Sequence, residues 1–84
     1  MYNVKFTKQA AKDAKKIGMA GLKSKVEALI DIIKNNPYQN PPPYEKLSGR
    51  SSMYSRRINV HHRLVYRIFE NNTLRIIRMW THYE

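Results

Sequence analysis

The chain has 84 residues, enough for a single domain with a small core. Its formal net charge of +10 favours a nucleic acid, an anionic membrane surface or an acidic protein as partner. The absence of cysteine excludes disulfide bonds and thiolate metal sites, and no apolar run is typical of a signal peptide or a membrane span, so we expect one cytoplasmic domain over residues 1–84.

The first predicted elements are a strand and a helix. Apolar side chains alternate with polar ones over residues 2–6, which is typical of a short strand with one buried face. Thr7 suits the N-cap of a following helix, and Gly18 suits a left-handed stop. The side of this helix expected to face the core carries Ala10, Ala11, Ala14 and Ile17.

A second amphipathic helix is predicted from about residue 19 or 21 to Asn35. Its apolar residues recur at three- and four-residue steps: Leu22, Val26, Leu29, Ile30 and Ile33. Asn35, Asn36 and Pro37 end it, because asparagine tolerates a left-handed turn and proline cannot continue a helix. We interpret the lysine-rich sides of this helical hairpin as solvated faces; attachment to a membrane surface is the alternative.

The second half of the chain predicts a sheet. Residues 40–43, Asn-Pro-Pro-Pro, form a stiff spacer, and residues 48–52 form a loop. Strands are expected at 53–58, 63–70 and 74–83, with Asn71-Asn72 as a hairpin turn. The order β-α-α-β-β-β predicts an α+β fold, in which the N-terminal strand and the helical hairpin pack on a small, mainly antiparallel twisted sheet.

Neither of the last two strands has a purely apolar face. In the first, Leu64, Tyr66 and Ile68 alternate with Arg63, Val65, Arg67 and Phe69. In the second, Leu74, Ile76, Arg78, Trp80 and His82 alternate with Arg75, Ile77, Met79, Thr81 and Tyr83. We therefore expect one face of the sheet to pack on the helices and the other to collect arginine, histidine and aromatic side chains.

The type of basic residue changes along the chain. Every basic residue up to position 36 is lysine, whereas Lys46 is the one lysine that follows, among seven arginines. A guanidinium binds phosphate or carboxylate through two parallel hydrogen bonds, while an ammonium acts as a hydrated point charge. The second half is therefore the half expected to recognise an anion.

The residues present suit metal-free cleavage of RNA. That reaction needs a group to accept the 2′-hydroxyl proton, a group to protonate the departing 5′-oxygen, and cations against the phosphorane. Glu45 is the one acid beside the arginine-rich segment, and it is either the proton acceptor or an ordinary ion-pair partner of Arg56 or Arg57. No metal-ligand spacing or Gly-rich phosphate loop is present, so no metal or cofactor is expected.

Further candidates follow from side-chain chemistry. An imidazole titrates near neutral pH, so His82 is a candidate general acid, and Tyr83 could stack on an unstacked base. Arg63 could stabilise the phosphorane while Arg56 and Arg57 hold flanking phosphates. From composition alone, this set indicates a basic RNA- or DNA-binding α+β domain.

Four short segments resemble the YoeB-type toxins of the RelE/ParE superfamily, the mRNA-cleaving halves of bacterial type II toxin–antitoxin pairs. They are Glu45-Lys46-Leu47, Tyr54-Ser55-Arg56-Arg57-Ile58, His62-Arg63-Leu64-Val65-Tyr66 and His82-Tyr83. Their order and approximate spacing match the family pattern, and the helical hairpin fits its first half. The chain differs from the pattern at Ser48, where the family often has lysine, and at Glu84, which follows the usually terminal tyrosine.

The resemblance implies a RelE/YoeB-like fold and a ribosome-dependent mRNA endonuclease that inhibits translation. By residue-to-residue match, Glu45 corresponds to the general base, Arg63 to the phosphate-stabilising arginine, His82 to the general acid and Tyr83 to the tyrosine that positions substrate. The RNA-binding residues expected around them are Lys46, Arg50, Arg56, Arg57 and His62.

The resemblance also implies partners. These are mRNA in the ribosomal A site, the ribosome, and a YefM/Phd-like antitoxin whose acidic, disordered tail would neutralise the positive charge. Operator DNA would be contacted only through the antitoxin complex, and the chain would be a monomer or a homodimer. The alternative function is a non-catalytic nucleic-acid- or gyrase-binding basic protein on the same fold, which needs no Glu-Arg-His-Tyr set.

Overall fold

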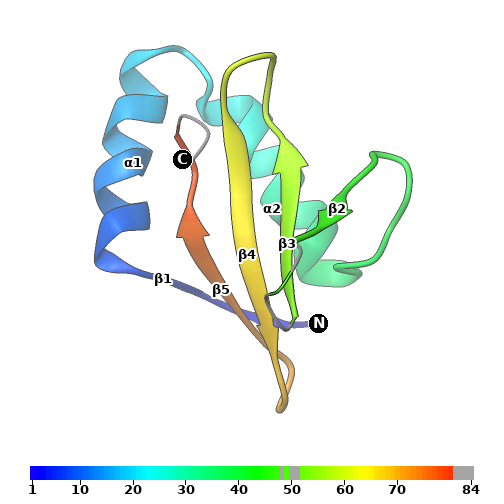
Figure 1. The fold of residues 1–84 in the computed structure, drawn as a ribbon. Coiled ribbons are helices and arrows are strands. Elements are labelled where there is room, and N and C mark those ends of the chain that lie inside the picture. Colours follow the sequence, from blue (N-terminus) through cyan, green and yellow to red (C-terminus); the bar gives the residue numbers. More distant parts are fainter. Residues whose placement is uncertain (48, 50–51, 81–84) are drawn as a thin grey trace.

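The computed structural model describes residues 1–47, 49 and 52–80. The elements in this part of the chain are β1 (Asn3–Phe6), α1 (Lys8–Met19), α2 (Lys23–Asn35), β2 (Glu45–Lys46), β3 (Met53–Arg57), β4 (Arg63–Phe69) and β5 (Thr73–Arg78). The strands form one sheet in the order β1-β5-β4-β3-β2, in which β1 runs parallel to β5 and the other neighbours are antiparallel (Figure 1). The predicted α+β fold is confirmed.

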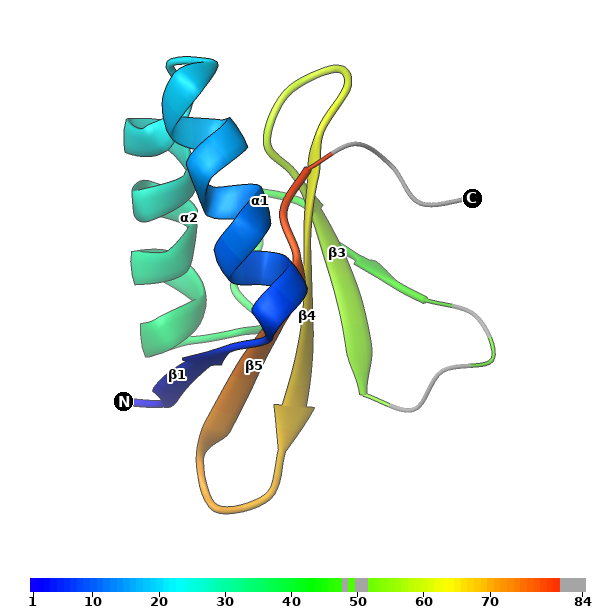
Figure 2. The same ribbon diagram turned by 90° about the vertical axis from the view of Figure 1, so that its left-hand side faces the viewer.

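Both helices lie on the same side of the sheet, as Figures 1 and 2 show from two directions. The two layers share one apolar core, formed mainly by Ala10, Ile17, Val26, Leu29, Ile33, Leu64, Tyr66, Leu74, Ile76 and Met79. No helix of the described residues covers the opposite face, and strand alternation places Arg63 and Arg67 there, because Leu64 and Tyr66 point into the core. None of the helices in the described part is long and apolar enough to cross a membrane.

α1 begins at the predicted cap. The Thr7 hydroxyl accepts a hydrogen bond from the Ala10 amide at 3.0 Å and donates one to the Ile77 carbonyl at 2.9 Å, so the cap also ties the helix to β5. The helix continues past Gly18, and the left-handed residue is Gly21, with a φ of 75°. The prediction that Gly18 ends the helix is therefore wrong.

The buried faces of the two helices follow the predicted stripes only in part. α2 buries Val26, Leu29 and Ile33, as its periodicity predicts. It ends at Asn35 as predicted, although Asn36 is extended rather than left-handed, with a φ of −155°. α1 buries Ala10, Asp13 and Ile17, whereas Ala11 and Ala14 are exposed, contrary to prediction. The side of α1 that meets the sheet therefore carries a carboxylate.

β4 and β5 form the predicted hairpin. Asn71 and Asn72, in the short connection between the paired residues Phe69 and Thr73, have φ values of 67° and 55°, left-handed conformations that asparagine tolerates. β5 ends at Arg78, earlier than the expected 83, and residues 81–84 lie outside the described part of the chain. The two asparagines thus correctly predicted the hairpin, whereas the predicted end of its second strand lies too far along the chain.

A bulge in β5 changes which residues share a face. Ile76 and Arg78 pair with consecutive residues of β4, so Ile77 is an extra residue on β5. Beyond the bulge the alternation is reversed: Met79 is buried in the core, and Arg78 is only half-buried. The prediction that Arg78 shares a face with Leu74 and Ile76 is therefore wrong, because strict alternation does not survive an inserted residue.

β2 was not among the predicted strands. Its two residues pair with β3, with Glu45 opposite Ser55 and Lys46 opposite Tyr54. Two residues are too few to show a readable alternation, so the sequence pattern alone cannot identify such a strand. This pairing fixes Glu45 at the edge of the sheet, next to the strands that carry the arginines.

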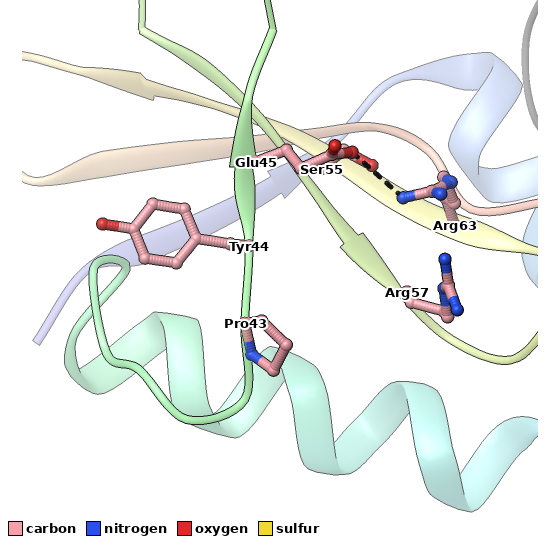
Figure 3. A pocket seen from close by; sticks show the side chains of 6 residues that line it. All are labelled: Pro43, Tyr44, Glu45, Ser55, Arg57 and Arg63. Atoms are coloured by element: carbon pink, nitrogen blue, oxygen red, sulfur yellow. Dashed lines mark hydrogen bonds and ion pairs between the residues drawn. The ribbon is translucent and has the colours of Figure 1, made fainter.

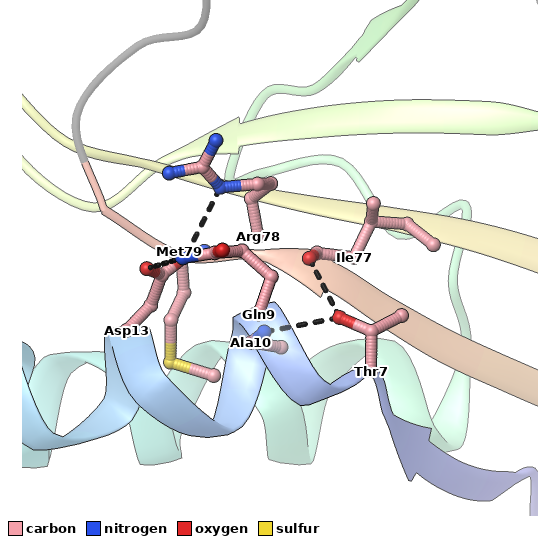
Figure 4. A network of polar contacts seen from close by, with 7 residues as sticks. All are labelled: Thr7, Gln9, Ala10, Asp13, Ile77, Arg78 and Met79. Carbon is pink, nitrogen blue, oxygen red and sulfur yellow. Dashed lines mark hydrogen bonds and ion pairs between the residues drawn. The ribbon is translucent and has the colours of Figure 1, made fainter.

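The buried Asp13 connects α1 to the end of β5 (Figure 4). Its carboxylate accepts hydrogen bonds from Gln9 Nε2 at 2.9 Å, from Arg78 Nε at 3.2 Å and from the Met79 amide at 3.1 Å. These contacts satisfy a buried charge, which would otherwise be strongly destabilising. They also fix the backbone at the point where β5 leaves the sheet.

Replacing Asp13 with asparagine is expected to lower the free energy of unfolding by about 2 kcal/mol at neutral pH, because a charged acceptor of buried hydrogen bonds is lost. Burial raises the pKa of Asp13, but the hydrogen bonds from Met79, Gln9 and Arg78, together with the Arg78 charge, outweigh burial and hold that pKa below 3.8. The carboxylate therefore stabilises the fold fully above about pH 4, and this contribution is lost as the pH falls through the lowered pKa.

Urea unfolding between pH 7 and pH 2 measures this contribution. The difference between wild type and Asp13→Asn should shrink below about pH 4. Asp31→Asn is the matched control, because Asp31 is exposed on α2 and should give wild-type stability throughout. A difference for Asp13→Asn that stays constant at every pH would contradict the assignment.

Candidate active site

Glu45 and Arg63 meet at one edge of the uncovered sheet face (Figure 3). Glu45 Oε1 and Arg63 Nη1 are 3.3 Å apart, and the two side chains are 69% and 28% exposed. From the sequence, Arg56 or Arg57 was the expected ion-pair partner if Glu45 formed an ordinary ion pair. In the structure, the ion-pair partner of Glu45 is Arg63. An exposed pair of this kind contributes only about 0–1 kcal/mol to stability. The carboxylate therefore remains accessible to a ligand without a large structural cost.

A pocket of about 350 Å³ surrounds this ion pair. It is lined by Pro43, Tyr44, Glu45, Ser55, Arg57 and Arg63. The two guanidiniums come from neighbouring strands, because Arg57 and Arg63 are paired residues of β3 and β4. A pocket with two guanidiniums can bind a phosphate, and the adjacent carboxylate can accept a proton from a group bound there. The structure thus unites three of the predicted site residues: Glu45, Arg57 and Arg63.

Lys46 does not share this pocket with Glu45. It pairs with Tyr54, and successive strand residues point to opposite faces, so Lys46 projects from the other side of β2. There its positive charge partly offsets the effects of burial and of Tyr54, which raise the pKa of Tyr38. Contact between Lys46 and RNA stays a prediction, but the structure separates Lys46 from the carboxylate.

Arg56 is buried in this structure, and its contact with RNA stays a prediction. Only 1% of the residue is exposed. Its guanidinium donates hydrogen bonds of 2.6–3.1 Å to the Tyr66 hydroxyl and to the carbonyls of Pro37, Gln39 and Pro42. It also lies 4.9 Å from the centre of the Tyr44 ring. Arg56 therefore anchors the proline segment that leads into Glu45 and has no face free for a phosphate.

Tyr66 supports the same anchor. Its hydroxyl accepts the Arg56 Nε hydrogen bond and donates one of 2.9 Å to the Pro37 carbonyl. Burial raises the pKa of Tyr66, and the adjacent guanidinium opposes that shift. The phenol thus completes a polar network beneath the proline segment, on the face of the sheet opposite to the pocket.

His62 also lies outside the pocket lining. Its ring stacks on Trp80, with ring centres 4.0 Å apart and planes inclined by 15°. The neighbouring Arg63 amide donates a hydrogen bond of 3.0 Å to the Trp80 carbonyl. These contacts hold the chain beyond β5 against the start of β4, beside the pocket arginine. A role for His62 in RNA binding stays a prediction.

The remaining predicted residues and arginines fall into separate groups. Arg50, His82 and Tyr83 lie outside the described residues. Arg67 and Arg75 each lie 5.0 Å from the centre of the Phe69 ring. Among the described residues, no group of three or more histidine, cysteine, aspartate or glutamate side chains could hold a metal ion. The described arginines therefore do not form one continuous anion site.

Sequence reasoning did not assign a role to Ser55, which lines the pocket between Glu45 and the two arginines. The sequence could have indicated this role, because Ser55 and Arg57 are two positions apart on a predicted strand and their side chains therefore lie on one face. Pro43 and Tyr44 were also missed, because a proline spacer has no readable register. Their place in the pocket depends on the Arg56 anchor.

Comparisons with known proteins agree on one family of proteins. Residues 4–84 match the family model for the ParE toxin of the type II toxin–antitoxin system parDE. The chain is similar to the YoeB/ParE toxin from Agrobacterium tumefaciens, with 28% identity, a TM-score of 0.86, and coverage of 96% of this chain and 99% of that one. No match was found among curated proteins.

Two structures from Staphylococcus aureus are also similar. The YoeB dimer shares 33% identity at a TM-score of 0.81, with 98% of each chain covered. The toxin in the heterotetrameric YoeB–YefM toxin–antitoxin complex shares 32% identity at a TM-score of 0.81, with 99% of each chain covered. These similarities extend over nearly the whole chain and therefore include the pocket strands.

Proposed function

The chain belongs to the ParE toxin family of type II toxin–antitoxin systems, as a YoeB-like member of the RelE/ParE superfamily, and from this premise we propose that it is an mRNA endonuclease. The observation that carries the proposal is the Glu45–Arg63 contact of 3.3 Å in one pocket with Arg57. A toxin that acted only by binding would need basic residues, but not a carboxylate placed among them.

In the proposed reaction, Glu45 accepts the proton of the ribose 2′-hydroxyl, and the 2′-oxygen attacks the adjacent phosphorus. Arg63 and Arg57 stabilise the negative charge of the phosphorane. The bond from phosphorus to the 5′-oxygen then breaks, and that oxygen takes a proton from a general acid. The products are a 2′,3′-cyclic phosphate on the upstream fragment and a free 5′-hydroxyl on the downstream one.

We assign the general acid to His82 and substrate positioning to Tyr83 on the basis of the resemblance. The supporting observation concerns Trp80, two residues earlier in the chain. Its carbonyl accepts the Arg63 amide hydrogen bond, and its ring stacks on His62. The approach to the chain end is therefore anchored next to the arginine that would hold the phosphate.

The proposed partners follow from the family. We propose that the substrate is mRNA in the A site of the ribosome, and that a YefM/Phd-like antitoxin with an acidic tail binds the +10 toxin. The Staphylococcus aureus relative has solved structures both as a dimer and in a heterotetrameric complex with YefM. We therefore propose that this chain forms a homodimer in the cytoplasm. We also propose that it contacts operator DNA only through its complex with the antitoxin.

Mapping the 5′ ends of cellular mRNA shortly after induction tests the proposal. The wild-type chain should create new ends within coding sequences, and Arg63→Ala should reduce them by about 100-fold, because a cation that opposes the phosphorane charge is removed. Arg67→Ala is the matched control: Arg67 lies on the same face of β4 but outside the pocket lining. DNA breaks without new mRNA ends would instead favour the gyrase-binding alternative.

A further inference from the structure

The Ser55 hydroxyl is a buried polar group with no partner among the described residues. Ser55 is 1% exposed, and its Oγ makes no hydrogen bond there. Buried hydroxyl groups are nearly always hydrogen-bonded, because a desolvated donor without an acceptor destabilises the fold. An unpaired group of this kind in a native domain indicates that its partner is supplied by a group other than the described residues.

The position of Ser55 shows where such a partner would bind. On β3 it lies opposite Glu45 of β2 and opposite Val65 of β4, at the centre of three strands. It lines the same pocket as Glu45, Arg57 and Arg63, and Figure 3 shows its side chain beside the ion pair. The hydroxyl is therefore next to the proton acceptor and to both cations of the proposed site.

The charges around Ser55 select the kind of partner. Glu45 Oε1 is already contacted by Arg63, so a ligand with its own acceptor oxygens suits the hydroxyl best. The two guanidiniums in the pocket favour an oxyanion that can accept hydrogen bonds from both of them at once. A phosphodiester provides both features, since its non-bridging oxygens are strong acceptors and carry the negative charge.

We propose that Ser55 contacts the substrate, its hydroxyl donating a hydrogen bond to a non-bridging oxygen of the scissile phosphodiester beside Arg57 and Arg63. The inference rests on the proposed function and adds a third, uncharged donor to that site. An uncharged donor stabilises the phosphorane without an additional cation that would compete with Arg63 for Glu45.

Ser55→Ala separates a substrate contact from a structural role. If the hydroxyl stabilised the fold, its removal would lower the melting temperature. Here it has no partner within the described chain, so Ser55→Ala should melt at the wild-type temperature or slightly higher. Single-turnover cleavage of ribosome-bound mRNA should nevertheless slow by about 10- to 100-fold, because a donor to the developing charge is lost.

Two further measurements make the test specific. Replacing the contacted phosphate oxygen by sulfur should slow the wild type more than Ser55→Ala, because only the wild type has a hydrogen bond to lose. A 2′-deoxy substitution at the cleaved nucleotide prevents attack, and Ser55→Ala should bind this uncleavable RNA several-fold more weakly than the wild type. Ser24→Ala, on the exposed side of α2, is the control and should match the wild type in every assay.

Each outcome decides a different question. Equal cleavage and equal binding by Ser55→Ala, or a lowered melting temperature, would overturn the role of Ser55 while the proposed function stands on wild-type cleavage. Failure of the wild type both to cleave mRNA and to bind the uncleavable RNA would overturn the proposed function, and this inference with it. Weaker binding by Ser55→Ala supports the contact even where cleavage is absent.

Discussion

Replacing Glu45 with glutamine is expected to slow mRNA cleavage by about 10²- to 10⁴-fold, the range lost when a general base is removed. Glutamine has the same size as glutamate but cannot take a proton from the 2′-hydroxyl. The fold should be little affected, because the Glu45 side chain is 69% exposed and its pairing with Arg63 is of the weakly stabilising kind. Single-turnover cleavage on programmed ribosomes and urea unfolding measure the two quantities separately.

Glu70 provides the matched control for this substitution. It is exposed, adjacent to the hairpin turn at Asn71, and Glu70→Gln changes the net charge by the same amount. It should cleave at the wild-type rate. Equal slowing of both variants would attribute the effect to the lost negative charge rather than to a lost proton acceptor. Full activity of Glu45→Gln would remove Glu45 from the mechanism.

The parts of the fold that could be predicted from the sequence are those that local physics determines. The α2 stripe, the Thr7 cap and the Asn71-Asn72 turn each depend on residues a few positions apart, and all three are present. The alternation along β4 was equally readable. Local patterns of this kind establish which elements form and in what order, and the α+β class follows from that order.

The parts that could not be predicted depend on contacts between distant segments. The bulge at Ile77 arises from the pairing of β5 with β4, and nothing near Ile77 in the sequence marks it. Asp13 was read as an ordinary acid on a helix, yet its three donors come partly from residues 65 and 66 positions away. Such a partner can be recognised only once the topology is known.

The opposite orientations of neighbouring strand residues explain why only some of the predicted site residues line the pocket. In both Glu45-Lys46 and Arg56-Arg57, one residue faces the pocket and the other faces away from it. On the predicted strand at 53–58, alternation places Arg56 and Arg57 on opposite faces, but either arginine could serve the pocket, because the choice depends on which face receives the helices. The helices cover the Arg56 face, so Arg57 is the arginine left for a ligand.

Replacing Arg56 with methionine is expected to lower the free energy of unfolding by about 3 kcal/mol or more, since hydrogen bonds to a buried charged group are lost. Methionine fills much of the same volume but donates nothing. The Tyr66 hydroxyl and the carbonyls of Gln39 and Pro42 therefore lose their donor, and the Pro37 carbonyl keeps only the hydrogen bond from Tyr66. Domains of this type have total stabilities on the order of 5–15 kcal/mol, so the loss is a large fraction. The urea midpoint measures it.

Arg57→Met makes the same substitution one residue further along β3, which isolates the effect of burial. Arg57 is exposed and lines the pocket, so its variant should stay within about 0.5 kcal/mol of wild-type stability while cleaving more slowly. Arg56→Met should lose stability and, because it releases the segment that positions Glu45, lose cleavage as well. Equal urea midpoints for the two variants would contradict the anchoring role of Arg56, because only the Arg56 substitution removes buried hydrogen bonds.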